Sequence, residues 1–274
     1  MRVIGVCRFS YPALGGFRRM HDTLEEREAY LYDDARMALR FRHFEALTLP
    51  SLAAQINPDF TLLVVIGERM PKRWLDRLHD VTARLPQVKI TPMPSMKHRL
   101  ALQLAIQKEI EGTKGDTIQF RLDDDDAIGV DFVQQSLFAM RRSTRFRKEC
   151  PRMVFEFNNG FSVAMTEKSL LVGPEISGFL SCGLSVLFPE GDKKTIMNFA
   201  HHKLHHEMPA VIQPSPPMYL RAKHADNDSG VKFEPEGLTP MTDAQKELIE
   251  KRFNVSEAHI ARVCAALPVS HDRA

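Results

Sequence analysis

Four short strand-like runs divide the first half of the chain, and a segment with helical spacing separates each run from the next. The first two runs are almost wholly apolar. Runs of this kind are typical of strands buried on both faces of a parallel sheet. They predict strands at residues 3–7, 60–66, 88–92 and 117–122. The segments between them predict helices at residues 33–49, 71–85 and 97–111. This alternation predicts an α/β fold with a mostly parallel central sheet and helices on both faces.

The first predicted helix is expected to supply core residues and to be interrupted at a proline. Met37, Phe41, Phe44 and Leu47 recur at helical spacing, which places them on one buried face. Pro50 is expected to interrupt the helix, because a proline removes a backbone donor and crowds the preceding turn, and a short helical turn is expected to follow at residues 52–55.

The second half of the chain predicts a smaller, antiparallel portion. The sequence Asn158-Asn159-Gly160 inside residues 152–164 is a hairpin signal. The other expected elements are a helix at 130–140, strands at 184–188 and 218–221, a histidine-dense helix at 195–208, and one or two helices within 240–265 capped by Thr242.

Four consecutive aspartates, Asp123 to Asp126, follow directly after the predicted strand at 117–122. Adjacent carboxylates repel one another unless a positive group lies among them, and a divalent cation is the usual such group. Ligands of open α/β sheets bind beyond the carboxyl ends of the strands, where this run would lie. The run therefore predicts an active-site floor that holds a metal. The alternative is a solvated acidic turn.

Other polar residues are expected at the same edge of the sheet, because the carboxyl ends of parallel strands meet there. Arg8 follows the first strand and Glu68 follows the second. The glycine-containing loop at residues 8–20 also carries Arg18 and Arg19, and its arginines are suited to bind phosphate.

Composition excludes several classes of protein. The net charge is only +2, so no global basic field indicates a nucleic-acid partner. The basic segment 141–148 is interpreted as the solvated end of a helix. The four cysteines have no CxxC spacing and favour a reducing compartment over a zinc site or disulfides. No signal segment or apolar run of membrane-spanning length is present, which predicts a cytoplasmic protein and leaves peripheral membrane association open.

Two stretches resemble a known group of enzymes. FEALTLPSLAAQINPDFTLLVVIG and IQFRLDDDDAIGVDFV resemble the nucleotide-sugar-binding half of GT-A-fold glycosyltransferases, with its Q-x-x-P-D-F turn and Asp-x-Asp motif. Within that group, the aspartate run and the His/Asn-rich tail resemble a bacterial rhamnosyltransferase family. The resemblance implies one continuous GT-A-like domain. Residues 1–140 would be the nucleotide-sugar-binding half, and residues 141–274 the acceptor-binding half with the C-terminal helices.

The resemblance also implies roles for individual residues. Asp125 is expected to bind Mn²⁺ or Mg²⁺, with Asp126 as an additional ligand and His224 as the ligand from a C-terminal strand. Asp123 is expected on the nucleotide side and Asp124 facing away from the metal, although a shift of register by one would exchange these roles. The full set expected to bind the donor is Arg8, Glu68, Arg99, Arg121, Asp123 and Asp124.

The catalytic base is expected near the start of the histidine-rich segment, with Glu190 and Asp192 as the leading candidates. The other candidates are His201, His202, His205 and Glu207. The HHxxHH spacing lacks the glutamate and third ligand of a zincin site, so zinc is not expected. Phe161, Phe179 and the loop with Gly178, Ser181 and Gly183 are expected on the acceptor side, with Phe161 favoured as a core residue.

Together these features predict a metal-dependent, inverting glycosyltransferase. It would move a sugar, rhamnose by the family resemblance alone, from a nucleotide-diphosphate donor to a glycan or lipid-linked acceptor. The alternative enzyme is a metal-dependent phosphoester hydrolase or nucleotidyltransferase, which also uses clustered aspartates. A calcium-binding or sugar-binding module is disfavoured, because the run lacks the alternating ligands of an EF-hand.

Overall fold

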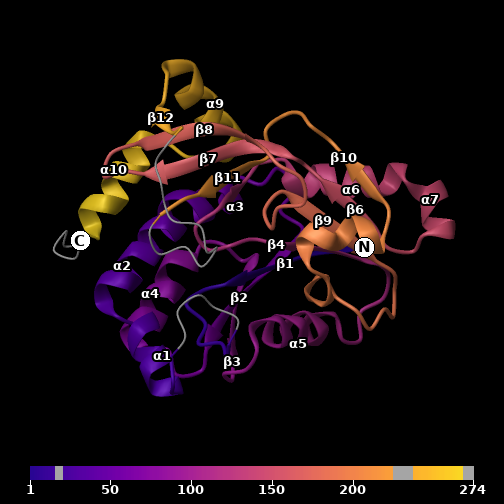
Figure 1. Cartoon of the computed structure of the whole chain (residues 1–274), viewed down its shortest axis with the longest axis horizontal. Helices are drawn as coiled ribbons and strands as arrows, with labels where there is room; N and C mark the ends of the chain where they lie inside the picture. The colour runs from indigo at the N-terminus through magenta and orange to yellow at the C-terminus, as the bar shows by residue number, and fades with distance from the viewer. Residues whose placement is uncertain (16–20, 225–236, 268–274) are drawn as a thin grey trace.

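A computed structural model describes residues 1–15, 21–224 and 237–267. Its core is a seven-stranded sheet in the order β10-β6-β9-β4-β1-β2-β3 (Figure 1). Strands β1 to β4 run parallel, whereas β9 is antiparallel to both of its neighbours. The strands are β1 Arg2–Arg8, β2 Thr61–Gly67, β3 Val88–Met93, β4 Thr117–Arg121, β6 Met153–Glu156, β9 Leu184–Phe188 and β10 Ala210–Ile212. The predicted α/β class with a mostly parallel sheet is confirmed.

The central strands are buried on both faces because their sequences are apolar on both faces. In β1, Val3 and Cys7 contact one hydrophobic cluster, whereas Ile4 and Val6 contact another. The two faces alternate along a strand with a period of two residues, so neighbouring side chains enter different clusters. The first cluster also includes Leu267, so the two halves of the chain share one core.

Helix α5 (His98–Ile110) covers one face of the sheet, and the helices from α1 to α4 lie on the other (Figure 1). Their bounds are α1 Leu24–Leu31, α2 Asp34–His43, α3 Leu49–Ala53 and α4 Lys72–Thr82. The sequence did not predict α1. The expected interruption at Pro50 is also wrong, because a π-helical segment, η1 (Phe44–Thr48), carries the helix into α3 with Pro50 in its first turn. The wider π turn accommodates the missing backbone donor.

The hairpin expected around Asn158-Asn159-Gly160 is not formed. Strand β6 pairs with β9 and β10, whereas β7 (Asn159–Met165) belongs to the second sheet. Gly160 has no positive φ angle; a Cβ atom there would lie 2.4 Å from the Tyr219 carbonyl oxygen. The glycine thus permits close approach of two strands, which the sequence pattern alone did not distinguish from a turn.

The second sheet has five strands in the order β12-β8-β7-β11-β5 and is antiparallel except between β7 and β11. Its other strands are β5 Ala127–Ile128, β8 Leu170–Ile176, β11 Tyr219–Ala222 and β12 Thr239–Pro240. Figure 1 shows this sheet along the upper side of the molecule, beside helices α9 (Asp243–Phe253) and α10 (Glu257–Ala266). Thr242 caps α9 as predicted, with a complete capping box.

The histidine-dense segment does not form the single helix that its composition suggested. It consists of two 3-10 turns, η2 (Ile196–Asn198) and η3 (His201–Lys203), followed by the short helix α8 (Leu204–Glu207). The two remaining helices are α6 (Phe132–Arg142) and α7 (Thr144–Glu149). All four cysteines are free. No helix formed by the described residues has the length and hydrophobicity that a membrane crossing requires.

Candidate active site

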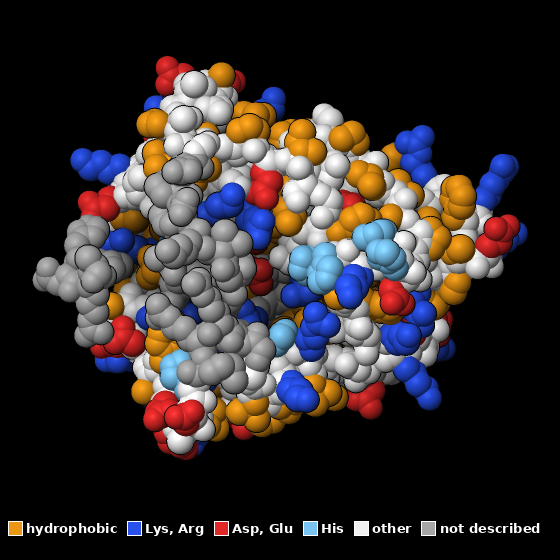
Figure 2. All heavy atoms as spheres, in the orientation of Figure 1, with side chains coloured by type: hydrophobic (Ala, Val, Ile, Leu, Met, Phe, Trp, Pro, Cys, Tyr) orange, Lys and Arg blue, Asp and Glu red, His pale blue; other side chains and the backbone are white. Residues whose placement is uncertain are grey.

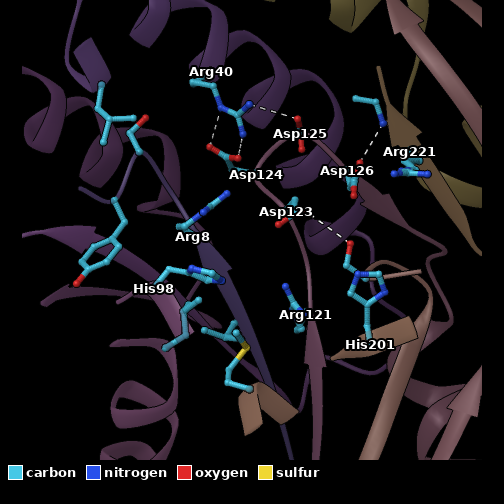
Figure 3. Close-up of a pocket in the computed structure, with 18 of the residues that line it drawn as sticks. Arg8, Arg40, His98, Arg121, Asp123, Asp124, Asp125, Asp126, His201 and Arg221 are labelled. Carbon is cyan, nitrogen blue, oxygen red and sulfur yellow. Dashed lines mark hydrogen bonds and ion pairs between the residues drawn. The ribbon is translucent and has the colours of Figure 1, made fainter. Parts of the chain in front are cut away.

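A cavity of about 290 Å³ lies beyond the carboxyl ends of β1 and β4. Helices α1, α2 and α5, the loop before β9 and the end of β11 contribute to its walls. Figure 2 shows the hollow near the centre of one face, with lysine and arginine side chains at its margin and histidines beside it. The charged lining residues are Arg8, Arg27, Arg36, Arg40, Arg121, Arg221 and all four aspartates of the run (Figure 3).

The positive group among the carboxylates is the side chain of Arg40, which α2 inserts into the site. Its Nε donates to Asp124 Oδ2 over 3.0 Å, and its Nη2 contacts the other oxygen of the same carboxylate. Its Nη1 lies 3.3 Å from Asp125 Oδ2 (Figure 3). Arg40, Asp124 and Asp125 are each no more than 8% exposed. A buried, bidentate guanidinium therefore supplies part of the positive charge that the aspartate run was expected to obtain from a metal.

Asp125 also contacts His224, as the sequence predicted for a shared site. His224 Nε2 lies 2.9 Å from Asp125 Oδ2 and 3.4 Å from Arg40 Nη1. Burial favours protonation of Asp125, but Arg40 and the hydrogen bond from His224 outweigh it and hold the pKa of Asp125 well below its ordinary value. Next to this group, burial and the neighbouring His224 lower the pKa of His43 to about 3, so the His43 ring is neutral.

The remaining two aspartates have different surroundings. Asp126 Oδ1 accepts the backbone N–H of Ala222 over 3.0 Å, which joins the acidic run to β11. Burial and the charges of Asp125 and Asp123 raise the pKa of Asp126 well above its ordinary value. Asp123 is half-buried and accepts a 3.3 Å hydrogen bond from Ser181. Asp123 is thus the most accessible carboxylate of the run.

Two arginines from neighbouring strands form the basic side of the cavity. Val6 of β1 pairs with Arg121 of β4, so Arg8 and Arg121 project toward the same face, where His98 of α5 lies (Figure 3). Burial lowers the pKa of Arg121, Asp123 opposes this effect, and the charge of Arg8 adds to it. Arg121 forms no ion pair with any carboxylate in the part of the chain that the structure describes. Such a guanidinium is stabilised by an anion from outside the chain.

A metal has two candidate ligands in this geometry. Among the described residues, no group of three or more His, Cys, Asp or Glu side chains is arranged to hold a metal ion. However, the 2.9 Å between Asp125 Oδ2 and His224 Nε2 is close to the separation of about 3 Å between adjacent ligands of a small divalent cation. Because Mg²⁺ and related ions take few protein ligands and complete their shell with phosphate and water, this pair fits such an ion.

Several residues expected in the site lie elsewhere. Glu68 and Arg99 are exposed and do not line the cavity. Glu190 and Asp192 line a separate cavity near Thr117, at the amino end of β4 and therefore at the opposite edge of the sheet. The Glu190 N–H donates to Asp116, and Asp192 forms an ion pair with Arg152. This placement does not support a catalytic role for either residue. Arg18 and Arg19, which were expected to bind phosphate, lie outside the described residues.

Three arginines that were not predicted to lie in the site reach the cavity from helices α1 and α2: Arg27, Arg36 and Arg40. A signal for Arg40 was present, because it shares the helical spacing of Met37 and Phe44 and therefore falls on the apolar face. A charged residue on such a face needs a buried partner. Asp124, expected to face away, is that partner and also lines the cavity.

Residues 2–235 match the model of a family described as "Putative rhamnosyl transferase". The chain belongs to this family. Membership of this family confirms the family resemblance stated from the sequence. No curated protein matches the sequence at a significant level.

Three solved structures are similar to this chain. S. aureus TarS 1-349 gives a TM-score of 0.41 at 11% identity over 81% of this chain and 60% of that chain. The same fragment in complex with UDP-GlcNAc gives 0.45 at 13% identity, over 97% and 71% of the two chains. A putative nucleotide-diphospho-sugar transferase from Desulfovibrio desulfuricans G20 gives 0.41 at 10% identity, over 97% and 96%. The chain spans less than two thirds of the first of these. Because these TM-scores are below 0.5, the assignment rests on the family and on the site.

Proposed function

We propose that this glycosyltransferase takes its sugar from a nucleoside diphosphate and that the diphosphate lies between Arg8 and Arg121. The observation that carries the proposal is the position of Arg121, which is half-buried beside Arg8; Arg121 itself forms no ion pair with a carboxylate among the described residues. Two guanidiniums at the ends of adjacent strands match the two phosphates of such a donor. The GT-A-like arrangement of nucleotide-binding strands in residues 1–140 and acceptor elements in residues 141–274 is part of this proposal.

The chemistry of transfer fits these residues. As the bond between the sugar and the diphosphate breaks, negative charge develops on the leaving oxygen, and Arg8 and Arg121 stabilise it. Asp123, the accessible carboxylate, lies close enough to the same space to bind donor hydroxyls. We further propose a single displacement with inversion at the sugar carbon, in which an acceptor hydroxyl attacks as the diphosphate leaves.

A divalent cation, Mn²⁺ or Mg²⁺, is the proposed cofactor. Asp125 and His224 would hold it, with Asp126 next to them and phosphate oxygens completing the shell. When bound, the cation would supply further positive charge for the leaving diphosphate. Arg40 would keep Asp124 and Asp125 in place whether or not the cation is present.

The rival hydrolase or nucleotidyltransferase fits less well. A two-metal site needs bridging carboxylates that surround two ions about 4 Å apart. The carboxylates in this cavity come from one segment, and Arg40 already binds two of them. The family also names rhamnose as the transferred sugar, and we propose rhamnose on that basis alone.

A surface at the end of α6 and in α7 supports a lipid-linked acceptor and peripheral membrane association. Phe138 and Phe146 are 53% and 63% exposed, and the Arg142 guanidinium lies 5.1 Å from the centre of the Phe138 ring. The exposed basic residues are Arg141, Arg142, Arg145 and Lys148. Exposed aromatic rings among basic residues match an anionic membrane surface, where each basic residue adds about 1 kcal/mol of attraction. We propose that this surface contacts the membrane that carries the acceptor.

Titration calorimetry with free nucleoside diphosphates tests the donor proposal. UDP, dTDP and GDP are titrated into the wild-type protein and into Arg121→Gln, with Arg84→Gln as an exposed control on α4's C-terminal side. Loss of one charged contact is expected to weaken the best ligand by about ten- to hundredfold in Arg121→Gln. Arg84→Gln should bind as the wild type does. Equal affinity in all three proteins, or no binding by any of them, would contradict the proposed donor site.

A further inference from the structure

The backbone of Phe179 is held on both sides by residues from other elements. Its N–H donates to Glu156 Oε1, and its carbonyl oxygen accepts a hydrogen bond from His201 Nδ1. Phe179 has a φ angle of 58°, in the left-handed region that residues other than glycine rarely adopt. Conformations of this kind persist where the surroundings enforce them, and they cluster at functional sites.

Glu156 supplies one side of this arrangement from the end of β6. It is 2% exposed, and its second oxygen, Oε2, has no hydrogen-bond partner in the described residues. Burial raises the pKa of Glu156, which the hydrogen bond from Phe179 partly offsets. A carboxyl group kept in such a costly environment needs a reason beyond packing. The contact with the Phe179 N–H supplies one, because it fixes the direction of that peptide.

His201 is on the other side and also lines the cavity. Because a carbonyl oxygen only accepts, the contact with Phe179 places a proton on Nδ1. A neutral imidazole then carries its lone pair on Nε2, for which no partner is present among the described residues. Asp123, Arg121 and His202 are the charged and titratable groups that act on this ring. Burial lowers the pKa of His201, and Arg121 adds to this effect, so the base form predominates at neutral pH.

We propose that His201 is the general base of the transfer reaction and that Glu156 positions it through the Phe179 peptide. The inference rests on the proposed donor site. In the step, the acceptor O–H bond breaks and its proton bonds to His201 Nε2, while the acceptor oxygen bonds to the sugar carbon. The bond from that carbon to the diphosphate breaks, and its electron pair leaves with the diphosphate. The imidazolium then returns its proton to solvent.

The other candidates for the base are less well placed. Glu190 and Asp192 lie at the opposite edge of the sheet. His202 is exposed and does not line the cavity, and His205 packs its ring 4.8 Å from the ring of Phe179. Figure 3 shows His201 on the opposite side of Asp123 from Arg40, toward the loop that carries Ser181. An acceptor that enters from that side would meet the donor sugar between His201 and Asp123.

The test compares His201→Asn with His202→Asn. Asparagine can still donate from its amide to the Phe179 carbonyl, but it has no basic nitrogen. The assay follows release of nucleoside diphosphate from dTDP-rhamnose and UDP-N-acetylglucosamine, with water as the acceptor, at a range of pH values. His201→Asn should lower kcat by about a hundred- to ten-thousandfold and abolish the fall in rate at acidic pH, with the diphosphate Kd unchanged. His202→Asn should resemble the wild type.

Glu156 is tested in the same assay. Glu156→Ala should lower kcat and move the acidic limb of the pH profile, with little change in the diphosphate Kd. Glu156→Gln keeps an oxygen that accepts the Phe179 N–H and should restore most of the lost rate. If His201→Asn keeps the wild-type rate and acidic limb while diphosphate still binds, the base assignment is wrong and the donor proposal stands. If the wild type binds no diphosphate, the donor proposal itself fails.

Discussion

Replacing Arg40 with methionine removes the positive charge that holds the acidic run together. The variant loses both contacts to Asp124 and the 3.3 Å contact to Asp125, and it leaves these carboxylates buried. Removing one partner of a buried ion pair costs about 3–5 kcal/mol, because the other charge is left uncompensated. For a chain of this size, we expect the Tm of Arg40→Met to fall by about 6–20 °C.

The loss in stability should depend on pH. Because the folded-state pKa of Asp125 is depressed, its contribution is present above the ordinary carboxylate pKa and is lost as the pH falls through the folded value. In Arg40→Met, only the His224 contact still opposes the effect of burial on Asp125, and Asp124 loses its partner, so protonation of these carboxylates restores part of the lost stability. The difference between the two proteins should therefore narrow as the pH falls from about 7 to about 4.

Urea denaturation followed by circular dichroism measures this difference at each pH, with and without Mn²⁺. The control is Arg73→Met, because Arg73 pairs with Asp34 while both side chains are more than 60% exposed. That exposed pair should contribute no more than about 1 kcal/mol. If Arg40→Met is destabilised no more than Arg73→Met near neutral pH, the run does not depend on Arg40 and our account of its charge balance is wrong.

The remaining predictions concern the metal, the opposite edge and the membrane surface. Asp125→Asn and His224→Ala should each remove the gain in diphosphate affinity on adding Mn²⁺, measured by calorimetry against an EDTA-treated sample; an undiminished gain would exclude the ligand in question. Glu190→Gln should retain the wild-type rate of donor hydrolysis, and a loss of more than about tenfold would restore it as a base candidate. The double variant Phe138→Ser/Phe146→Ser should sediment less with phosphatidylglycerol vesicles than the wild type does; equal sedimentation, or equal binding to phosphatidylcholine vesicles, would remove the proposed membrane surface.

The fold was predictable where the sequence repeats a strong local pattern. The strands β1 to β4 and the strand at 184–188 are formed where they were predicted. The errors arose where a residue type has more than one physical use. Gly160 admits a neighbouring backbone instead of making a turn, and Pro50 enters a helix after a π turn. In both cases a tertiary contact or a non-standard turn decided the outcome.

The site was predictable only in part. The aspartate run, Arg8 and Arg121 meet at one cavity, because β1 and β4 are parallel neighbours whose carboxyl ends lie together. His224 reaches Asp125 because β11, which precedes it, runs antiparallel to β5, which begins just after the aspartate run. Arg40 lies far from the run in sequence, so only the fold reveals its contact with Asp124. The prediction that Glu190 lies in the active site was wrong because it also depended on the direction of a strand. Strand β9 runs antiparallel to β4, which sends the residues after it to the opposite edge of the sheet.

The most direct test of this account is a crystal structure of the protein with UDP or dTDP bound. We predict that the diphosphate oxygens lie within hydrogen-bond distance of the guanidinium groups of Arg8 and Arg121, in the cavity beyond β1 and β4. A nucleotide bound at the other cavity, beside Leu104 and Glu190, with the Arg8–Arg121 side empty, would contradict the proposed function.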